Sequence, residues 1–76
     1  MTLTGQQVRD ACQLLRWGRY DLQRRTALPL QVIDRVMAAE TVIEATLVRE
    51  IVLNDGFHRA GVEFTPEGPR LREKLA

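Results

Sequence analysis

Apolar residues recur at intervals of three and four near the start of the chain, at Val8, Ala11, Cys12 and Leu15. This spacing predicts an amphipathic helix over about residues 5–16, with one face turned to a core. Thr4 and Gln7 form a T-x-x-Q capping box at its start. Leu3 and Val8 are placed to form a hydrophobic staple around that box.

A second, shorter helix is predicted over about residues 19–26, after Gly18 interrupts the apolar pattern. Leu22 is its inward anchor, and Asp21 in its first turn suits the positive end of the helix dipole. The predicted turn that follows is Thr26-Ala27-Leu28.

A third helix is predicted over about residues 30–38, with Pro29 near its start, where the missing N–H costs nothing. Its inward residues are Ile33, Val36 and Met37. Its outward residues are Gln31, Asp34 and Arg35, with Leu30 and Val32 at the margin. Two short helices joined by a tight turn, here over about residues 18–38, are typical of a helix-turn-helix, which inserts its second helix into the DNA major groove.

Residues 42–60 are apolar around much of a helix circumference, which indicates more than one packing partner. The stretch LVREIVL suits a strand by composition, but the length and the flanking Glu and Ala residues favour a helix. Asn54-Asp55-Gly56 would weaken or kink such a helix, so a turn that divides the segment in two is the alternative. Gly61 stands where a C′ glycine ends a helix.

A short β-hairpin is predicted after Gly61. Val62 and Phe64 alternate as in a strand, and Thr65-Pro66-Glu67-Gly68 has Pro and Gly at type I turn positions. Arg70-Leu71-Arg72 returns as the second strand. The chain therefore divides into a helical domain over residues 1–61 and a C-terminal strand or hairpin with its tail over residues 62–76.

The composition suits one small domain with one modest core, since 45% of the 76 residues are hydrophobic. The net charge of +1 is unevenly divided. Residues 1–38 carry six arginines and three aspartates, whereas residues 39–76 carry five cations and seven acids. This division suggests that one end faces a polyanion. Ten of the eleven cations are arginine, which suits bidentate contacts to phosphate and guanine.

Side chains for catalysis or metal binding are few. His58 is the only histidine and Cys12 the only thiol, which excludes an internal disulfide and a cysteine-based zinc site. Cys12 lies on the predicted buried face, where an inert core role is favoured. We therefore expect no catalytic residues, no enzyme activity, no metal and no cofactor. No apolar run or signal region points to a membrane, so a cytoplasmic protein is expected.

Several residues carry a resemblance to a known family: Thr4, Gly5, Val8, Arg9, Leu14, Leu15, Trp17, Leu22, Arg25 and the AGVEF stretch over residues 60–64. On these residues the chain resembles the lambda-repressor-like, XRE-type helix-turn-helix family of bacteria and phages, from residue 3 to about residue 64. The resemblance implies a mostly α fold, a lambda-repressor-like bundle of four to five helices with a short C-terminal β-hairpin or strand. It also implies DNA binding in the cytoplasm, in association with the nucleoid.

The chain departs from the family pattern at Gly18-Arg19 (for Ser/Thr-Gln), Gln23 (for a small residue), Ala27 (for the turn glycine) and Pro29 (for the helix cap). Two further departures are Cys12 and Met37, which stand where many members pair an arginine with a glutamate. Losing one partner of a buried ion pair costs about 3–5 kcal/mol, whereas replacing both with apolar groups is often neutral. The joint replacement therefore agrees with the alignment.

By position, the resemblance assigns base reading to Gln31, Val32, Asp34 and Arg35. Gln31 can bond an adenine edge, Arg35 a guanine and Val32 a thymine methyl. Asp34 either accepts from cytosine or orients Arg35. The phosphate-binding candidates are Arg19, Arg24, Arg25 and Arg16. Glu40, near the loop that in relatives approaches the DNA backbone, would oppose binding.

These assignments predict a sequence-specific transcriptional regulator that binds a pseudo-palindromic site on double-stranded DNA as a homodimer, with its reading helices about 34 Å apart. Dimer contacts are expected from Val48, Ile51, Val52, Phe57, Val62 and Phe64. The alternative is a helix-turn-helix-derived module that binds a protein partner, as an antitoxin binds its toxin or an adaptor binds polymerase. The altered turn, Glu40 and the near-neutral net charge favour this alternative.

Overall fold

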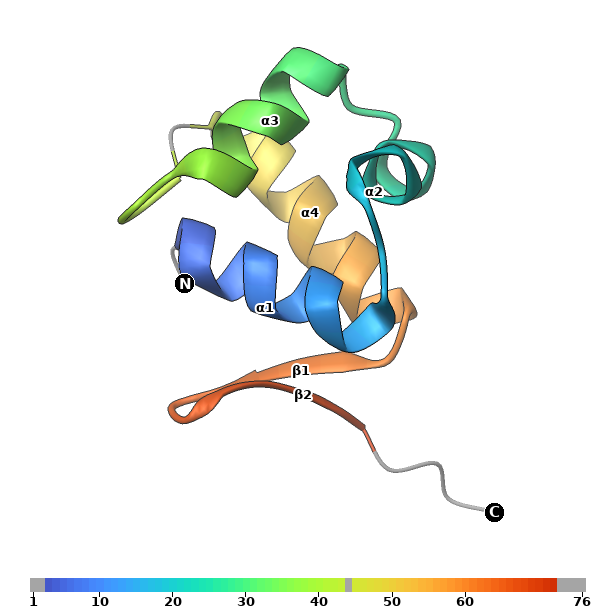
Figure 1. Cartoon of the computed structure of the whole chain (residues 1–76), viewed down its shortest axis with the longest axis vertical. Coiled ribbons are helices and arrows are strands. Elements are labelled where there is room, and N and C mark those ends of the chain that lie inside the picture. The colour runs from blue at the N-terminus through green and yellow to red at the C-terminus, as the bar shows by residue number, and fades with distance from the viewer. Residues whose placement is uncertain (1–2, 44, 73–76) are drawn as a thin grey trace.

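The computed structural model describes residues 3–43 and 45–72, which form four helices and one two-stranded antiparallel sheet (Figure 1). The helices are α1 (Gly5–Leu15), α2 (Arg19–Thr26), α3 (Leu30–Ala38) and α4 (Leu47–Arg59). The strands are β1 (Val62–Thr65) and β2 (Gly68–Leu71). The described part of the chain is thus mostly helical with a small C-terminal sheet, as the sequence predicts. None of its helices is long and apolar enough to cross a membrane.

One apolar core lies between the helices, and Phe57 is its largest fully buried side chain. Trp17 stacks on the Phe57 ring with 5.9 Å between the ring centroids. Phe64 meets the same ring edge-on, also at 5.9 Å. Phe57 therefore ties α4 both to the segment between α1 and α2 and to the hairpin.

The start of α1 has the predicted capping box. The Gln7 backbone N–H donates to Thr4 Oγ1 at 3.1 Å, and the Thr4 N–H donates to Gln7 Oε1 at 3.0 Å. Leu3 and Val8, the predicted staple residues, are both buried in the core. These local bonds satisfy amide groups that have no partner inside the helix, which explains why the helix begins here.

The start of α1 also lies against the end of α3. A Cβ added to Gly5 would lie 1.9 Å from the carbonyl oxygen of Ala39, so only glycine permits this approach. The Arg9 guanidinium donates to the carbonyl oxygens of Met37 and Ala39, both at 2.8 Å, where α3 ends. Cys12 is buried, and Met37 packs half-buried on the same core. The two helices therefore meet through apolar contacts and Arg9.

The helix predicted to start at Val42 starts instead at Leu47, so this part of the prediction is wrong. Val42 forms an isolated antiparallel β-bridge with Thr4. Beside it, the Ile43 N–H donates to the carbonyl oxygen of Leu3 at 3.1 Å. These backbone groups pair with the segment that precedes α1, and groups used in this way cannot belong to a helix.

Helix α4 begins after Thr46, whose side chain accepts from the Arg49 N–H at 3.2 Å. It runs without a break through Asn54-Asp55-Gly56, so the alternative of two separate segments is wrong. Gly56 is buried, and a Cβ at this position would lie 3.3 Å from Thr26 Cγ2 of α2. The glycine that weakens the helix locally thus permits the close approach of α2 and α4.

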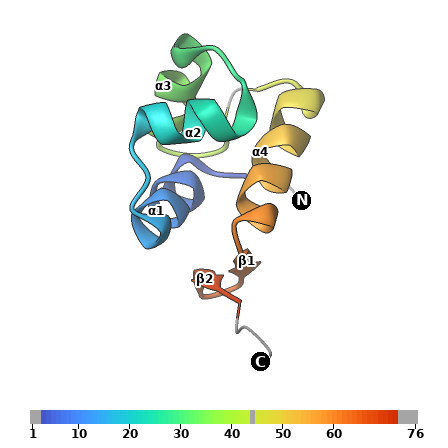
Figure 2. The ribbon, with the colours of Figure 1, turned by 90° about the vertical axis from the view of Figure 1, so that its right-hand side faces the viewer.

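The C-terminal hairpin agrees with its prediction. Gly61 has a φ of +95° after the end of α4, and Val62 pairs with Leu71 while Thr65 pairs with Gly68. Figures 1 and 2 place the hairpin next to α1, at the end of the molecule opposite α3. The hairpin therefore leaves α3 uncovered.

Candidate nucleic-acid interface

The helix-turn-helix unit consists of α2, a turn over residues 27–29 and α3. Leu22 of α2 is fully buried, as are Ile33 and Val36 of α3. Their burial fixes α3 against α2 and turns its remaining sides to solvent. The predicted bounds and inward residues of both helices are confirmed, except that Met37 is only half-buried.

The turn between α2 and α3 relies on Thr26. Its Oγ1 donates to the carbonyl oxygen of Leu22 at 2.8 Å and accepts from the Leu28 N–H at 3.4 Å. Ala27 then adopts the left-handed conformation, with φ of 58° and ψ of 20°. The departure from glycine at this position thus leaves the left-handed turn in place.

The exposed face of α3 carries three of the four predicted base-reading residues. Gln31, Asp34 and Arg35 are exposed and lie at spacings of three and four, so they share one side of the helix. Val32 lies at the margin of this face, half-buried and packed against the core. Arg35 and Glu40 line the same shallow hollow, which brings a negative charge near the end of α3.

Asp34 pairs with Arg19 across α2 and α3. The Arg19 guanidinium donates to Asp34 Oδ2 at 2.5 Å, and both side chains remain about half exposed. The same guanidinium lies over the Tyr20 ring, 5.2 Å from its centroid. Of the two roles predicted for Asp34, orienting an arginine fits this geometry, but the arginine is Arg19 and not Arg35.

Arg24 and Arg25 lie on another side of α2, where they line a hollow with residues near the end of α4. Arg24 donates to Asp21 Oδ1 at 2.6 Å. The Arg25 guanidinium lies over the Trp17 ring, 5.4 Å from its centroid. Of the predicted phosphate-binding residues, Arg19 therefore lies beside the exposed face of α3, whereas Arg24 and Arg25 lie next to α4.

Arg16 stands apart from the other arginines. It is the C-cap of α1, exposed and in the left-handed conformation, with φ of 56° and ψ of 38°. None of the contacts within the described residues joins its side chain to α3. Its role as a phosphate-binding residue therefore stays a prediction.

Asp21 closes the start of α2. Its carboxylate accepts from the Gly18 N–H at 2.8 Å and from Arg24. The hydrogen bond from the Gly18 N–H, and to a lesser degree the one from Arg24, holds the pKa of this carboxyl below its usual range. Asp21 thus caps α2 after a glycine that has no side chain for the purpose.

The predicted dimer-interface residues differ in how far they are buried. Phe57 and Val62 belong to the core of the chain itself and present no outer surface. Val52 and Phe64 are half-buried against that core. Val48 and Ile51 remain exposed on α4.

Leu47, which was not among the predicted interface residues, is 73% exposed, more than any other large hydrophobic residue described. Its spacing of four from Ile51 is the signal in the sequence that could have placed it on the same side of the helix as Ile51. Within the described residues, no group of three or more His, Cys, Asp or Glu side chains could hold a metal ion.

Comparison of the chain with protein-family models, with curated proteins and with solved structures finds no match.

Proposed function

We propose that this chain is a member of the lambda-repressor-like, XRE-type helix-turn-helix family and binds double-stranded DNA by inserting α3 into the major groove. The observation that carries the proposal is the uncovered face of α3, where Gln31, Asp34 and Arg35 lie together beside Arg19 of α2. A helix that presents polar side chains in this way fits the major groove, which is about 12 Å wide.

The side chains of this face suit base edges. Gln31 can donate to and accept from adenine, and two N–H groups of the Arg35 guanidinium can donate to O6 and N7 of guanine. The exposed part of Val32 can touch a thymine methyl. A cationic Arg19 beside the face can contact phosphate, which positions the helix without reading sequence.

Asp34 lowers the affinity for DNA through its ion pair with Arg19. Because it neutralises Arg19 in the free protein, a DNA phosphate competes with the carboxylate for the guanidinium. The pair therefore weakens binding to DNA of any sequence, while leaving base contacts from Gln31 and Arg35 available. This arrangement lowers the affinity for all DNA alike and leaves the difference between sequences to the base contacts.

The test is selection of bound duplexes from a random DNA pool, followed by titration of the selected site. Arg35→Ala should weaken binding by about 1–3 kcal/mol and relax the preference at one base position. Arg70→Ala is the matched control, because it removes the same charge from β2, at the opposite end of the molecule. It should change affinity little.

In the same titration, Asp34→Asn should strengthen binding to unrelated DNA and steepen the salt dependence by up to about 0.9 in slope, since one more cation is free to meet phosphate. Loss of preference for a cytosine would instead assign Asp34 to base reading. No enrichment of any sequence, together with equal affinities of wild type and Arg35→Ala, would remove the DNA-binding proposal.

We further propose that the protein acts as a homodimeric transcriptional regulator at the nucleoid. Two-fold symmetry in the protein would then match a pseudo-palindromic site, with one α3 in each half-site about 34 Å apart. A domain of this size also gains from a partner that covers apolar surface which its own core leaves exposed.

A further inference from the structure

Two hollows adjoin where α1, α2 and α4 end. One, of about 730 Å³, lies between the last turn of α1, the end of α4 and the end of β2. The other, of about 250 Å³, lies between the end of α2 and the end of α4. Arg59 and Ala60 line both, so the two hollows form one continuous surface, named here the end groove. Figure 1 places the ends of α1 and α4 below α2.

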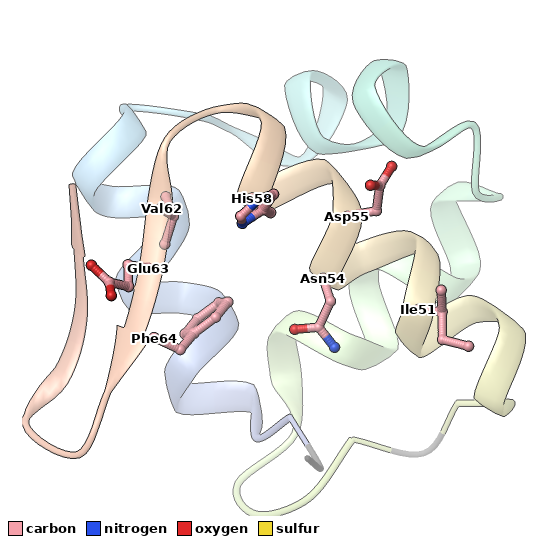
Figure 3. A pocket seen from close by; sticks show the side chains of 7 residues that line it. All are labelled: Ile51, Asn54, Asp55, His58, Val62, Glu63 and Phe64. Carbon is pink, nitrogen blue, oxygen red and sulfur yellow. The ribbon is translucent and has the colours of Figure 1, made fainter. Parts of the chain in front are cut away.

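The charges that line the end groove are all positive. Among the described residues that line it, none is acidic and four are arginines: Arg24, Arg25, Arg59 and Arg72. Three other hollows each include at least one acid. The hollow between α4 and β1, for example, is lined by Asp55 and Glu63 (Figure 3). A hollow lined by charges of one sign attracts ligands of the opposite sign, so the end groove suits an anion.

The arginines keep donors for such a ligand, although two of them are in ion pairs. Arg59 binds Asp55 through Nε at 2.9 Å, so its two terminal nitrogens can donate elsewhere. Arg24 binds Asp21 through Nη2 at 2.6 Å. Exposed pairs of this kind contribute at most about 1 kcal/mol, so a ligand that meets several arginines at once can compete with them. Four arginines and two aspartates also leave a surplus of two positive charges.

The end groove has an apolar part as well. Leu14 and Leu71 are two of the seven large hydrophobic residues that are exposed in the described chain, at 40% and 51%. Both line the hollow of about 730 Å³, although they belong to α1 and β2. Leu15 and Ala60 extend this apolar lining. A hollow of this composition suits an aliphatic side chain.

The ligand that fits both parts carries several acids next to an apolar group. A nucleic-acid backbone offers the acids alone and would leave Leu14 and Leu71 without an apolar partner. A fatty acid offers one carboxylate for four arginines. A peptide supplies carboxylates and aliphatic side chains along one chain, at about 3.3 Å per residue when extended.

We propose that the end groove binds an acidic peptide segment of another protein, with its carboxylates on the arginines and an aliphatic side chain against Leu14 and Leu71. This inference rests neither on DNA binding nor on dimerisation. It also gives a function to Arg24 and Arg25, which lie next to α4 and away from the exposed face of α3.

The end groove leaves the proposed DNA-binding face accessible. None of the described residues that line it belongs to α3. Gln31 and Arg35 therefore stay free when a peptide is bound. A chain with both surfaces would link a DNA site to an acidic partner protein.

The experiment begins with a random library of twelve-residue peptides displayed on phage, selected against the immobilised full chain. Enriched peptides should carry at least two Asp or Glu residues next to an aliphatic residue. Synthetic copies of these peptides are then titrated against the protein in solution. Replacing their acids with Asn and Gln, or their aliphatic residues with Ala, should each weaken binding about tenfold or more.

Arg59→Ala should weaken binding of a selected peptide about tenfold, because it removes the arginine that both hollows share. Arg70→Ala is the matched control: each arginine is well exposed and has one ion pair, but Arg70 lies outside the end groove. Leu71→Ser should also weaken binding about tenfold, whereas Val48→Ser, at an exposed position near the start of α4, should leave it unchanged. Arg35→Ala should bind the peptide as wild type does, which separates this test from that of DNA binding.

Arg59→Lys keeps the charge at the shared position and should retain most of the affinity, so the loss in Arg59→Ala is not one of folding. No enrichment, enriched peptides without acids, or equal losses for Arg59→Ala and Arg70→Ala would each overturn the inference. Weaker binding of duplex DNA by Arg59→Ala, with its peptide affinity unchanged, would overturn it as well, because the end groove would then bind phosphate.

Discussion

Ala27 is the residue at which the turn between α2 and α3 stores backbone strain. Its φ is 58°. This left-handed conformation raises the free energy of an L-residue by about 1–2 kcal/mol and that of glycine by little. The chain nevertheless makes the turn, because Thr26 and the buried Leu28 fix the backbone on either side. This explains how the unit keeps its geometry without a glycine.

Ala27→Gly should therefore stabilise the protein by about 1 kcal/mol, measured as a higher urea midpoint with an unchanged slope. Ala38→Gly, at an exposed helical position of α3, is the control and should lower stability. A destabilised Ala27→Gly would show that the strain released is smaller than the extra backbone entropy that glycine loses on folding.

Cys12 gives the protein a pH dependence on the alkaline side. Burial, with a smaller contribution from Asp21, raises the pKa of this thiol to about 11, against an ordinary value of 9.0. Between these values the unfolded chain has lost the proton and the folded chain keeps it, so stability is full below pH 9 and falls as the pH rises toward 11. Thermal unfolding across this range should show the fall, and Cys12→Ala should lack that component. Equal slopes for the two proteins would contradict the assignment.

At the scale of the elements, the contact between α1 and α3 depends on Gly5. A methyl group there would need to displace the backbone at Ala39, because the Cβ would lie 1.9 Å from the carbonyl oxygen. Gly5→Ala should therefore lose about 1–3 kcal/mol of stability in denaturant unfolding. Gly18→Ala is the matched control, since its Cβ would meet only Asp21 Oδ2 at 3.8 Å. Similar losses at both positions would refute the role of close approach.

The elements themselves follow largely from local signals. The Thr4 capping box, the apolar spacing of α1 and the turn residues of the hairpin predict helix and strand positions that the structure confirms. The start of α4 could not be predicted in this way. Val42 and Ile43 suit a helix locally, and only their pairing with the chain before α1 makes them extended. That pairing joins residues almost forty positions apart, which no local pattern contains.

The candidate site likewise follows in part from local spacing and in part from contacts between distant segments. Spacing predicts which residues of α3 face outward, because burial of Ile33 and Val36 determines the opposite side. Sequence reasoning did not find the partner of Asp34, because Arg19 lies on another helix. Leu47 was missed for another reason: a segment that is apolar around much of a helix circumference does not show which of its sides packs on the core.

At the scale of the whole molecule, the proposed DNA binding and dimerisation together predict the spacing of the DNA site. Two copies of the selected half-site about 10 bp apart should bind wild type cooperatively, since both α3 helices then lie on one side of the duplex. Insertion of half a turn, about 5 bp, should abolish that cooperativity. Equal binding of wild type to both duplexes would show that the dimer does not couple the two reading helices.

What the sequence by itself determined is the set of local structures: an amphipathic α1 with its own cap, two short helices about a tight turn, and a terminal hairpin. The tertiary structure alone decided where α4 begins, that Phe57 and Val62 lie in the core, that Arg19 pairs with Asp34, and which side of α4 is left open. The physical reason is the distance along the chain over which each interaction acts. Caps, turns and helical spacing act over a few residues, whereas burial and ion pairing depend on which distant segments the packed core brings together.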